Sequence, residues 1–111
     1  METIESRDDA VVIIEPRGRV DSNTAKAFEE KLLGAISPTD PRMIIDCFQL
    51  DYVSSAGLRV LLMAAKRIKA NKGKLALAGL KPHVQEVFDV SGFSSIFAIH
   101  PSRAAALATV R

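Results

Sequence analysis

The most informative reactive side chains in this sequence are the adjacent hydroxyls of Ser54 and Ser55. They lie in Phe48–Leu62 (FQLDYVSSAGLRVLL), where a polar stretch passes into a helical pattern. Ser54 suits an N-cap, because its hydroxyl can accept a hydrogen bond from the free amides of a first helical turn. Gly57 costs a helix about 1 kcal/mol relative to alanine, so it indicates close approach by the sheet or by a partner. These residues fit an ordinary helix start with close helix–strand packing, and they also fit close approach by a partner.

The remaining nucleophiles and potential ligands show no spacing that indicates catalysis or metal binding. Cys47 cannot form an intramolecular disulfide, and at a strand end it is expected to be a small buried apolar residue. His83 and His100 each neighbour a proline and are expected to make loop hydrogen bonds. No nucleophile elbow, phosphate loop or dinucleotide fingerprint occurs. We therefore expect no enzyme activity, no cofactor and no metal.

Three carboxylates, those of Asp21, Asp46 and Asp51, could meet at one edge of a sheet. Together they would imitate the metal-binding acid pocket of a response-regulator receiver. That fold requires paired acids after its first strand, whereas Asp8-Asp9 precede a strand here. We expect the three acids to cap loops or to take part in an interface.

Composition limits the class of protein. The chain has 111 residues, of which 48% are hydrophobic and 25% charged, with a net charge of +2. This length and apolar content predict one domain with its own core, and the small charge argues against direct nucleic-acid binding. The polar start and short apolar runs predict neither a signal peptide nor membrane insertion. With its lone cysteine, the chain is expected in the cytoplasm.

Two hydrophobic periodicities alternate along the chain and predict its elements. The strands are expected at Thr3–Arg7, Ala10–Glu15, Met43–Cys47, Lys74–Ala78 and Ile96–Ile99, and the helices from Asp21 or Ser22 to Ile36 and at Ala56–Ala70, Pro82–Val90 and Ser102–Val110. Pro16 through Val20 is expected to leave its strand, and Ser37–Pro41 (SPTDP) to break a helix.

Alternation of strands and helices predicts an α/β domain with a largely parallel sheet. Ligands and partners of such sheets meet the loops at the carboxyl ends of the strands, which selects Arg17–Asp21 and Phe48–Gly57. A separate basic cluster follows the second helix, and it comprises Lys66, Arg67, Lys69, Lys72 and Lys74. We interpret the cluster as a solvated helix end, with contact to acidic lipid or protein as the alternative.

The segment IIDCFQLDYVSSAGLRVLL resembles the signature of the STAS domain, the fold of bacterial anti-sigma-factor antagonists. In that family a strand ends in Asp, and an apolar position and Asp-Ser-Ser-Gly-Leu then open a helix. Ser54 takes the Asp position, Ser55 that of the phosphorylated serine and Ala56 that of the second serine. Gly57-Leu58 match directly, whereas Ser54 and Ala56 depart from the pattern. The departure leaves Ser54 as a second-choice phosphate acceptor.

The resemblance extends along the chain. RGRVD resembles the family's Gly-x-hydrophobic-Asp, and AGLKPHVQEVFDVSGFSSIFAIHPSRAAAL resembles its closing section. It implies a single STAS domain over 1–111, with a mixed, mostly parallel β-sheet and helices packed against it. The implied partner-binding residues are Asp21, Ser54, Ser55, Ala56, Gly57, Leu58 and Arg59. Leu58 and Arg59 would lie beside the serine on the exposed start of the helix.

The resemblance also implies a function. The unphosphorylated protein would bind an anti-sigma factor that is also a serine kinase and so release the sigma factor. Phosphorylation at Ser55 would switch binding off, and a serine phosphatase would reset the cycle. A free-standing exchange partner of this kind is expected to be a monomer. The alternative is a STAS accessory subunit of a membrane lipid ABC transporter, in which the serine has no regulatory cycle.

Overall fold

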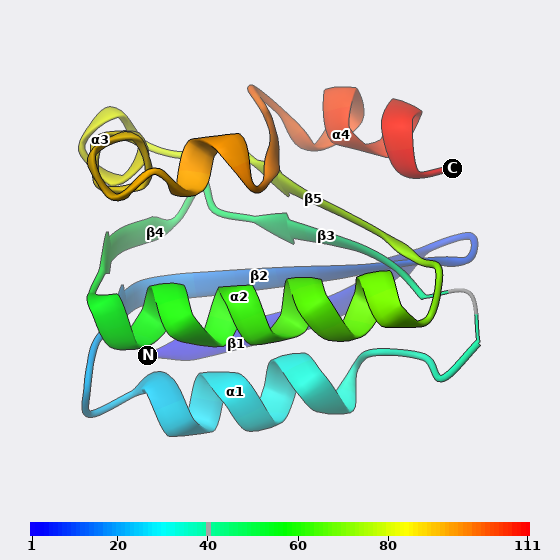
Figure 1. Ribbon diagram of the computed structural model, residues 1–111, viewed down its shortest axis with the longest axis horizontal. Helices are drawn as coiled ribbons and strands as arrows, with labels where there is room; N and C mark the ends of the chain where they lie inside the picture. The colour runs from blue at the N-terminus through cyan, green and yellow to red at the C-terminus, as the bar shows by residue number, and fades with distance from the viewer. Residues whose placement is uncertain (40) are drawn as a thin grey trace.

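The computed structural model describes residues 1–39 and 41–111. Within them six strands form one sheet in the order β1-β2-β3-β5-β6, with β4 paired to β2 (Figure 1). The strands are β1 (Glu2–Asp8), β2 (Val11–Val20), β3 (Arg42–Asp46), β4 (Leu50–Val53), β5 (Lys74–Ala78) and β6 (Ala98–His100). The helices are α1 (Ala25–Gly34), α2 (Ser55–Ala70), α3 (Pro82–Ser91) and α4 (Arg103–Val110), with a 3-10 turn η1 at Phe93–Ser95.

The sheet is mixed and mostly parallel, which confirms the predicted fold class. β1 lies at an edge and pairs antiparallel with β2, whereas every other described pairing is parallel. β2 and β3 consist largely of buried apolar residues, because helices cover both faces of the sheet. This burial explains why their sequences are continuous apolar runs and not alternating patterns.

Helices cover both faces of the sheet, and α1 and α2 lie side by side on one of them (Figure 1). α1, α2 and α3 contribute to the larger core, where Phe28, Leu61 and Phe88 are among the buried side chains. α4 covers the opposite face, and its Ala106, Leu107 and Val110 pack in a smaller core against residues of β2, β3 and β5. No helix in the described part of the chain is long and apolar enough to cross a membrane.

β2 is longer than the sequence predicts. The expected strand stopped at Glu15, but the observed one passes through Pro16 to Val20. Pro16 pairs with Thr3 of the antiparallel neighbour. On the other side of β2, the parallel pairing with β3 ends at Ile14, and the parallel pairing with β4 begins at Gly18. A proline without an N–H is tolerated there, because β2 changes partner around this position.

The boundaries of the other elements shift by a few residues. α1 begins after Thr24, so neither Asp21 nor Ser22 is its N-cap, contrary to the prediction. The backbone carbonyl of Asp21 instead accepts a hydrogen bond from the Ala25 amide in the turn before the helix. The break predicted at Ser37–Pro41 falls between α1 and β3, and Asp40 within it lies outside the described residues.

Near the C-terminus, the predicted strand at Ile96–Ile99 is replaced by a shorter one. The chain leaves α3 through Gly92, which has φ +81°, and forms η1 before it joins the sheet as β6. Glycine suits that left-handed conformation because it has no Cβ. Because η1 precedes β6 and the strand begins only at Ala98, β6 pairs only with the second part of β5, from Ala76 to Ala78.

Candidate functional site

Ser54 is the N-cap of α2, as its position in the sequence predicts. Its side-chain oxygen accepts a hydrogen bond from the Gly57 amide at 3.4 Å, and its φ and ψ of −89° and 176° are extended. Its amide donates to the Val20 carbonyl at 2.8 Å, and its carbonyl accepts from the Leu58 amide at 2.9 Å. Ser54 is therefore held between the end of β2 and the first turn of α2.

Ser55 is the first residue of α2, and its side chain is exposed. Its hydroxyl makes no hydrogen bond to any residue that the structure describes. The position lies at a helix N-terminus, where the free amides and the helix dipole favour an anion. Of the two serines, one is engaged in the cap and the other presents an unengaged hydroxyl to solvent.

Gly57 lies directly against the sheet, which explains why a glycine occurs in the first turn of α2. A Cβ at this glycine would lie 2.7 Å from Val53 Cγ2 and 2.8 Å from Val20 Cγ1. Real Cβ contacts are longer than this, so the sheet itself fills the space where a side chain would stand. The close approach is to β2 and β4 and not to a partner.

Leu58 does not lie where the resemblance implies. It was expected beside Ser55 on an exposed surface, but its side chain is only 6% exposed and belongs to the larger core. The reason is helical periodicity, which places Leu58 on the same face as Leu61 three residues later. Arg59, by contrast, is exposed, four residues after Ser55. Residues four apart on a helix are neighbours on its surface, so Arg59 stands next to Ser55.

The segment Phe48–Gly57 is not a simple loop, as the sequence suggested, because it contains the strand β4. β4 pairs in parallel with the last part of β2, with Val53 opposite Val20. The residues that follow the two strands, Asp21 and Ser54, therefore leave the sheet side by side. This pairing brings the two predicted parts of the partner surface together.

Arg19 and Tyr52 extend the same surface. Both lie in the two segments selected from the sequence, but neither residue was singled out there. They are register partners in β2 and β4, and the Arg19 guanidinium lies 4.2 Å from the centre of the Tyr52 ring. Both side chains are exposed, and Arg19 Nε also lies 3.8 Å from a carboxylate oxygen of Asp21. An exposed arginine–aromatic pair on adjacent strands forms a cation–π contact that orders this surface. The signal in the sequence is only that each residue directly precedes a valine, in RVD and in YVS.

A shallow groove of about 330 Å³ continues this surface between α1 and α2. Ala56 and Arg59 line it on α2, and Lys26 and Glu29 line it on α1. Ala56, at the position of a second serine in the resembled pattern, is half-buried. The exposed side of the candidate site thus consists of the first turns of both helices and the ends of β2 and β4.

The three carboxylates considered for a metal pocket do not meet. Asp46 pairs with Arg103 at 2.8 Å, Asp51 with Lys81, and Asp21 with Arg19. Among residues 1–39 and 41–111, no cluster of three His, Cys, Asp or Glu side chains could hold a metal. Asp46 instead accepts from the Phe48 amide at 3.4 Å, which is the loop-capping role predicted for it.

Cys47 takes the structural role expected for it, whereas His83 does not lie in a loop as predicted, because the helix α3 already begins at Pro82. Cys47 is buried, and burial together with the neighbouring Asp46 charge raises the pKa of its thiol. A thiol with a raised pKa is a poor nucleophile. His83 lies in α3, and its Nε2 is 2.6 Å from the Asp51 carbonyl oxygen.

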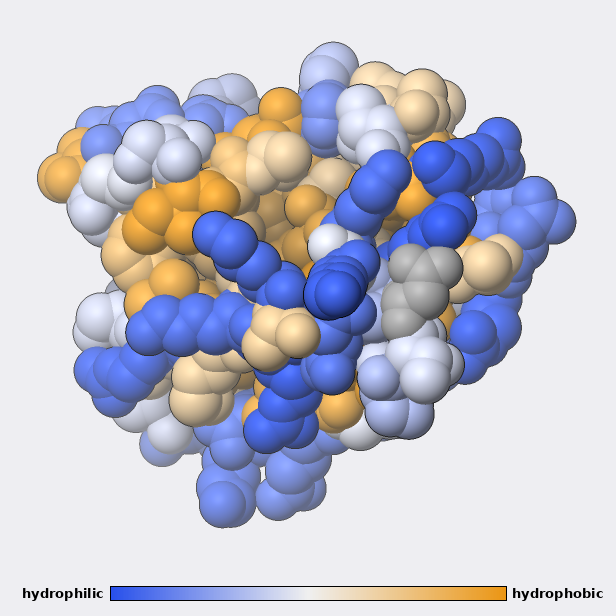
Figure 2. Space-filling model, turned by 45° about the vertical axis from the view of Figure 1, so that its right-hand side comes forward, coloured by the Kyte–Doolittle hydropathy of each residue, from blue (hydrophilic) through white to orange (hydrophobic). Residues whose placement is uncertain are grey.

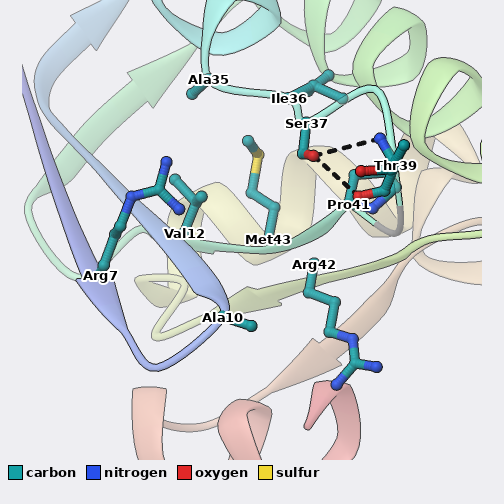
Figure 3. A pocket seen from close by; sticks show the side chains of 10 residues that line it. All are labelled: Arg7, Ala10, Val12, Ala35, Ile36, Ser37, Thr39, Pro41, Arg42 and Met43. Carbon is teal, nitrogen blue, oxygen red and sulfur yellow. Dashed lines mark hydrogen bonds between the residues drawn. The ribbon is translucent and has the colours of Figure 1, made fainter.

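The hollow in Figure 3 lies away from Ser54 and Ser55, neither of which lines it. It has a volume of about 260 Å³ and is lined by residues that include Arg7, Ala35, Ser37 and Met43. These residues come from the end of β1, from the segment that follows α1 and from the start of β3. Ser55 lies instead at the carboxyl end of β2, the edge where open α/β sheets meet their ligands.

A family model described as the STAS domain matches residues 3–106. The chain belongs to the STAS domain family. The match begins in β1 and ends in α4, so it includes every strand described above and the whole serine-bearing turn.

Relatives of this STAS domain carry the name of anti-sigma factor antagonists. BtrV of Bordetella bronchiseptica, which bears that name, is 44% identical over 103 residues, which are 93% of this chain and 89% of BtrV. A Thermotoga maritima crystal structure with the same designation has a TM-score of 0.90 at 19% identity, over 98% and 94% of the two chains. The phosphorylated Bacillus cell fate determinant SpoIIAA has a TM-score of 0.73 at 21% identity, over 99% and 100%.

These likenesses place the STAS domain with the anti-sigma factor antagonists, which are regulators and not enzymes. The predicted family and fold are thereby confirmed. The two likenesses to solved structures concern the fold, because both have low sequence identity.

Proposed function

We propose that this STAS domain, over residues 1–111, is a phosphorylation-controlled anti-sigma factor antagonist. Its unphosphorylated form binds an anti-sigma factor that is also a serine kinase, and the sigma factor is released. The kinase transfers the γ-phosphoryl group of ATP to the Ser55 hydroxyl, with ADP as leaving group, and the complex separates. A serine phosphatase hydrolyses the phosphate ester and restores the binding form.

The observation that carries this proposal is the difference in exposure and hydrogen bonding between the Ser54 and Ser55 side chains. Ser55 is exposed with an unengaged hydroxyl, whereas the Ser54 oxygen already accepts from the Gly57 amide. A kinase can reach Ser55 without disturbing the fold, but at Ser54 it would have to displace the cap. The relation to BtrV supports the antagonist role. Ser55 is thus the proposed acceptor, and Ser54 is the second choice.

Phosphorylation at Ser55 acts on the partner surface and not on the fold. A phosphate adds about −1.5 to −2 charge, and at a helix N-terminus the amides and the dipole favour that charge. Arg59, its exposed neighbour one turn along, adds a positive group on the same face. The domain therefore stays folded, while the bulk and charge of the phosphate oppose binding of the partner. A few kcal/mol suffice to change binding by about a hundredfold.

The proposed contact surface is narrower than the matched signature. Asp21, Ser54, Ser55, Ala56 and Arg59 present exposed or half-buried side chains around the start of α2. Gly57 and Leu58 are buried and act by placing that turn against the sheet. We propose that the domain engages its partner as a monomer through this surface.

The test compares matched serine variants in a pull-down from source-cell lysate followed by mass spectrometry. The baits are the wild type, Ser55→Asp and the control Ser6→Asp, which places the same charge on exposed β1. Wild type and the control should capture an anti-sigma kinase, and Ser55→Asp should lose it by about tenfold or more. Capture of one transporter ATPase by all three baits would instead favour the lipid-transporter subunit.

A second assay locates the acceptor. The purified captured kinase and labelled ATP are mixed with wild type, Ser54→Ala and Ser55→Ala. Labelling of the first two and not of the third is expected. Loss of label only in Ser54→Ala would move the acceptor to Ser54, and label in all three would contradict both assignments. Circular dichroism of each variant separates a lost site from a lost fold.

A further inference from the structure

The edge of the sheet is incomplete beside the second half of α2. β6 pairs with β5 only from Ala76 onward, so Leu75 has no β6 partner and is half-buried. The chain before β6 turns away through η1, which leaves Ile96 53% exposed. Between this segment and α2 lies a groove of about 370 Å³. Figure 2 shows apolar surface gathered in a hollow on this side of the molecule, with strongly hydrophilic side chains beside it.

The groove combines an apolar floor with a cationic edge. Leu62, Ala65, Leu75 and Ile96 supply apolar lining, and Lys66 and Lys69 line the same space. A volume of this size falls in the range of small-molecule sites, which are mostly apolar with a few placed polar groups. The lining therefore indicates a ligand with an aliphatic part and a negatively charged part.

The two charged residues that line the groove, Lys66 and Lys69, are both cationic. Residues 52–85 contain seven Lys and Arg residues and no Asp or Glu. The other eight Lys and Arg residues and all thirteen Asp and Glu residues lie in the rest of the chain. Lys66 and Lys69 form no ion pair with any residue in the described part of the chain. Three residues apart on α2, they lie on one face and repel each other. An anion between them would relieve that repulsion.

The helix dipole accounts for only part of this arrangement. Cations in the last turn of a helix are favourable, which explains Arg67 and Lys69 on α2. It does not explain the half-buried Leu75 and the exposed Ile96 beside them, or the absence of acids from the surrounding segment. The concave shape also separates this groove from a membrane-binding surface, because a flat bilayer would meet the lysines before the floor.

We propose that this groove binds an anionic amphiphile with a single aliphatic chain and a terminal carboxylate, the class of medium-chain fatty acids. The chain lies along Leu62, Ala65, Leu75 and Ile96, and the carboxylate lies between the ammonium groups of Lys66 and Lys69. The groove borders the C-terminal half of α2, whereas Ser55 begins that helix, so this site is separate from the partner surface. It does not depend on the phosphorylation cycle.

The test is an NMR titration of the full chain with decanoate, kept below the concentration at which it forms micelles. Saturable shifts at the amides of Ala65, Leu75 and Ile96 are expected. The double variant Lys66→Glu/Lys69→Glu, which alters only exposed side chains, should weaken binding by about tenfold or more. Ile96→Asp should do the same, because it puts a carboxylate into the apolar lining. The control Arg7→Glu/Lys31→Glu reverses two exposed charges on β1 and α1, away from both surfaces, and should leave binding unchanged.

Three results would overturn the proposal. The first is the absence of saturable decanoate shifts. The second is a lack of charge dependence, seen either as equal binding of decyltrimethylammonium, which has the opposite charge, or as equal decanoate binding by the wild type and the double variant of the groove. The third is binding to phosphatidylglycerol vesicles without binding to free decanoate, which would assign the basic surface to a membrane.

Discussion

Gly57 of α2 lies so close to Val20 of β2 that a Cβ on the glycine would stand 2.8 Å from Val20 Cγ1 and 3.2 Å from the Val20 carbonyl oxygen. The same carbonyl accepts the Ser54 amide at 2.8 Å. The first turn of α2 is thus fixed against the end of β2 by a hydrogen bond and by close packing. This contact decides where the Ser55 hydroxyl stands relative to Asp21.

Substitution of Gly57 by alanine should destabilise the domain. Helix propensity alone would favour alanine by about 1 kcal/mol. The added methyl would overlap two valine side chains and the Val20 carbonyl, and overpacking of this kind costs about 1–3 kcal/mol. We expect a net loss in the free energy of unfolding, measured by urea denaturation. The matched control is Gly34→Ala in α1, where a Cβ meets nothing within 4 Å and no loss is expected. Equal stability of the two variants would contradict the contact.

The two serines should separate in stability measurements. Ser54→Ala removes the oxygen that caps α2 and should cost about 1 kcal/mol in the free energy of unfolding. Ser55→Ala removes a hydroxyl without a described partner and should change stability by less than about 0.5 kcal/mol. Thermal or urea denaturation of both variants measures the difference. A larger loss for Ser55→Ala would reverse the assignment of the cap.

Arg103 of α4 should matter more to stability than an ordinary surface arginine. Its Nε donates to Asp46 at 2.8 Å and its Nη2 to Glu15 at 3.1 Å, and both carboxylates are buried. Arg103→Met would leave two buried carboxylates without this cation, which should cost about 3 kcal/mol. Arg111→Met removes the exposed pair with Asp8 and should cost less than about 1 kcal/mol. Urea denaturation that gives equal losses would contradict the bridging role.

Asp51 gives a pH-dependent prediction. The hydrogen bond from Lys81, and then its charge, hold the pKa of Asp51 below its ordinary value. A carboxyl with a lowered folded-state pKa stabilises the fold above its unfolded pKa of about 3.9, and that contribution is lost as pH falls through the folded pKa. Lys81→Met should raise the Asp51 pKa in an NMR titration. The stability difference between the two proteins should shrink in acid, and an unchanged Asp51 titration would contradict the pairing.

Much of the fold was open to prediction because its signals are local. Continuous apolar runs predicted the parallel strands, and Ser54 predicted a helix start that the structure confirms as an N-cap. β4 was missed because LDYV is short and its two central residues are exposed, so no apolar run marks it. The passage of β2 through Pro16 was missed because a proline normally ends a strand. Only the change of pairing partner makes it acceptable.

The sequence by itself determined the family, the α/β class and the serine pair at the start of a helix, because each is encoded in neighbouring residues. Tertiary structure decided that Gly57 and Leu58 face the sheet and the core, and that Arg19 and Tyr52 lie beside the site. These facts depend on the pairing of β4 with β2, which joins residues more than thirty positions apart. No local pattern records such a pairing, because its stability comes from packing between distant segments.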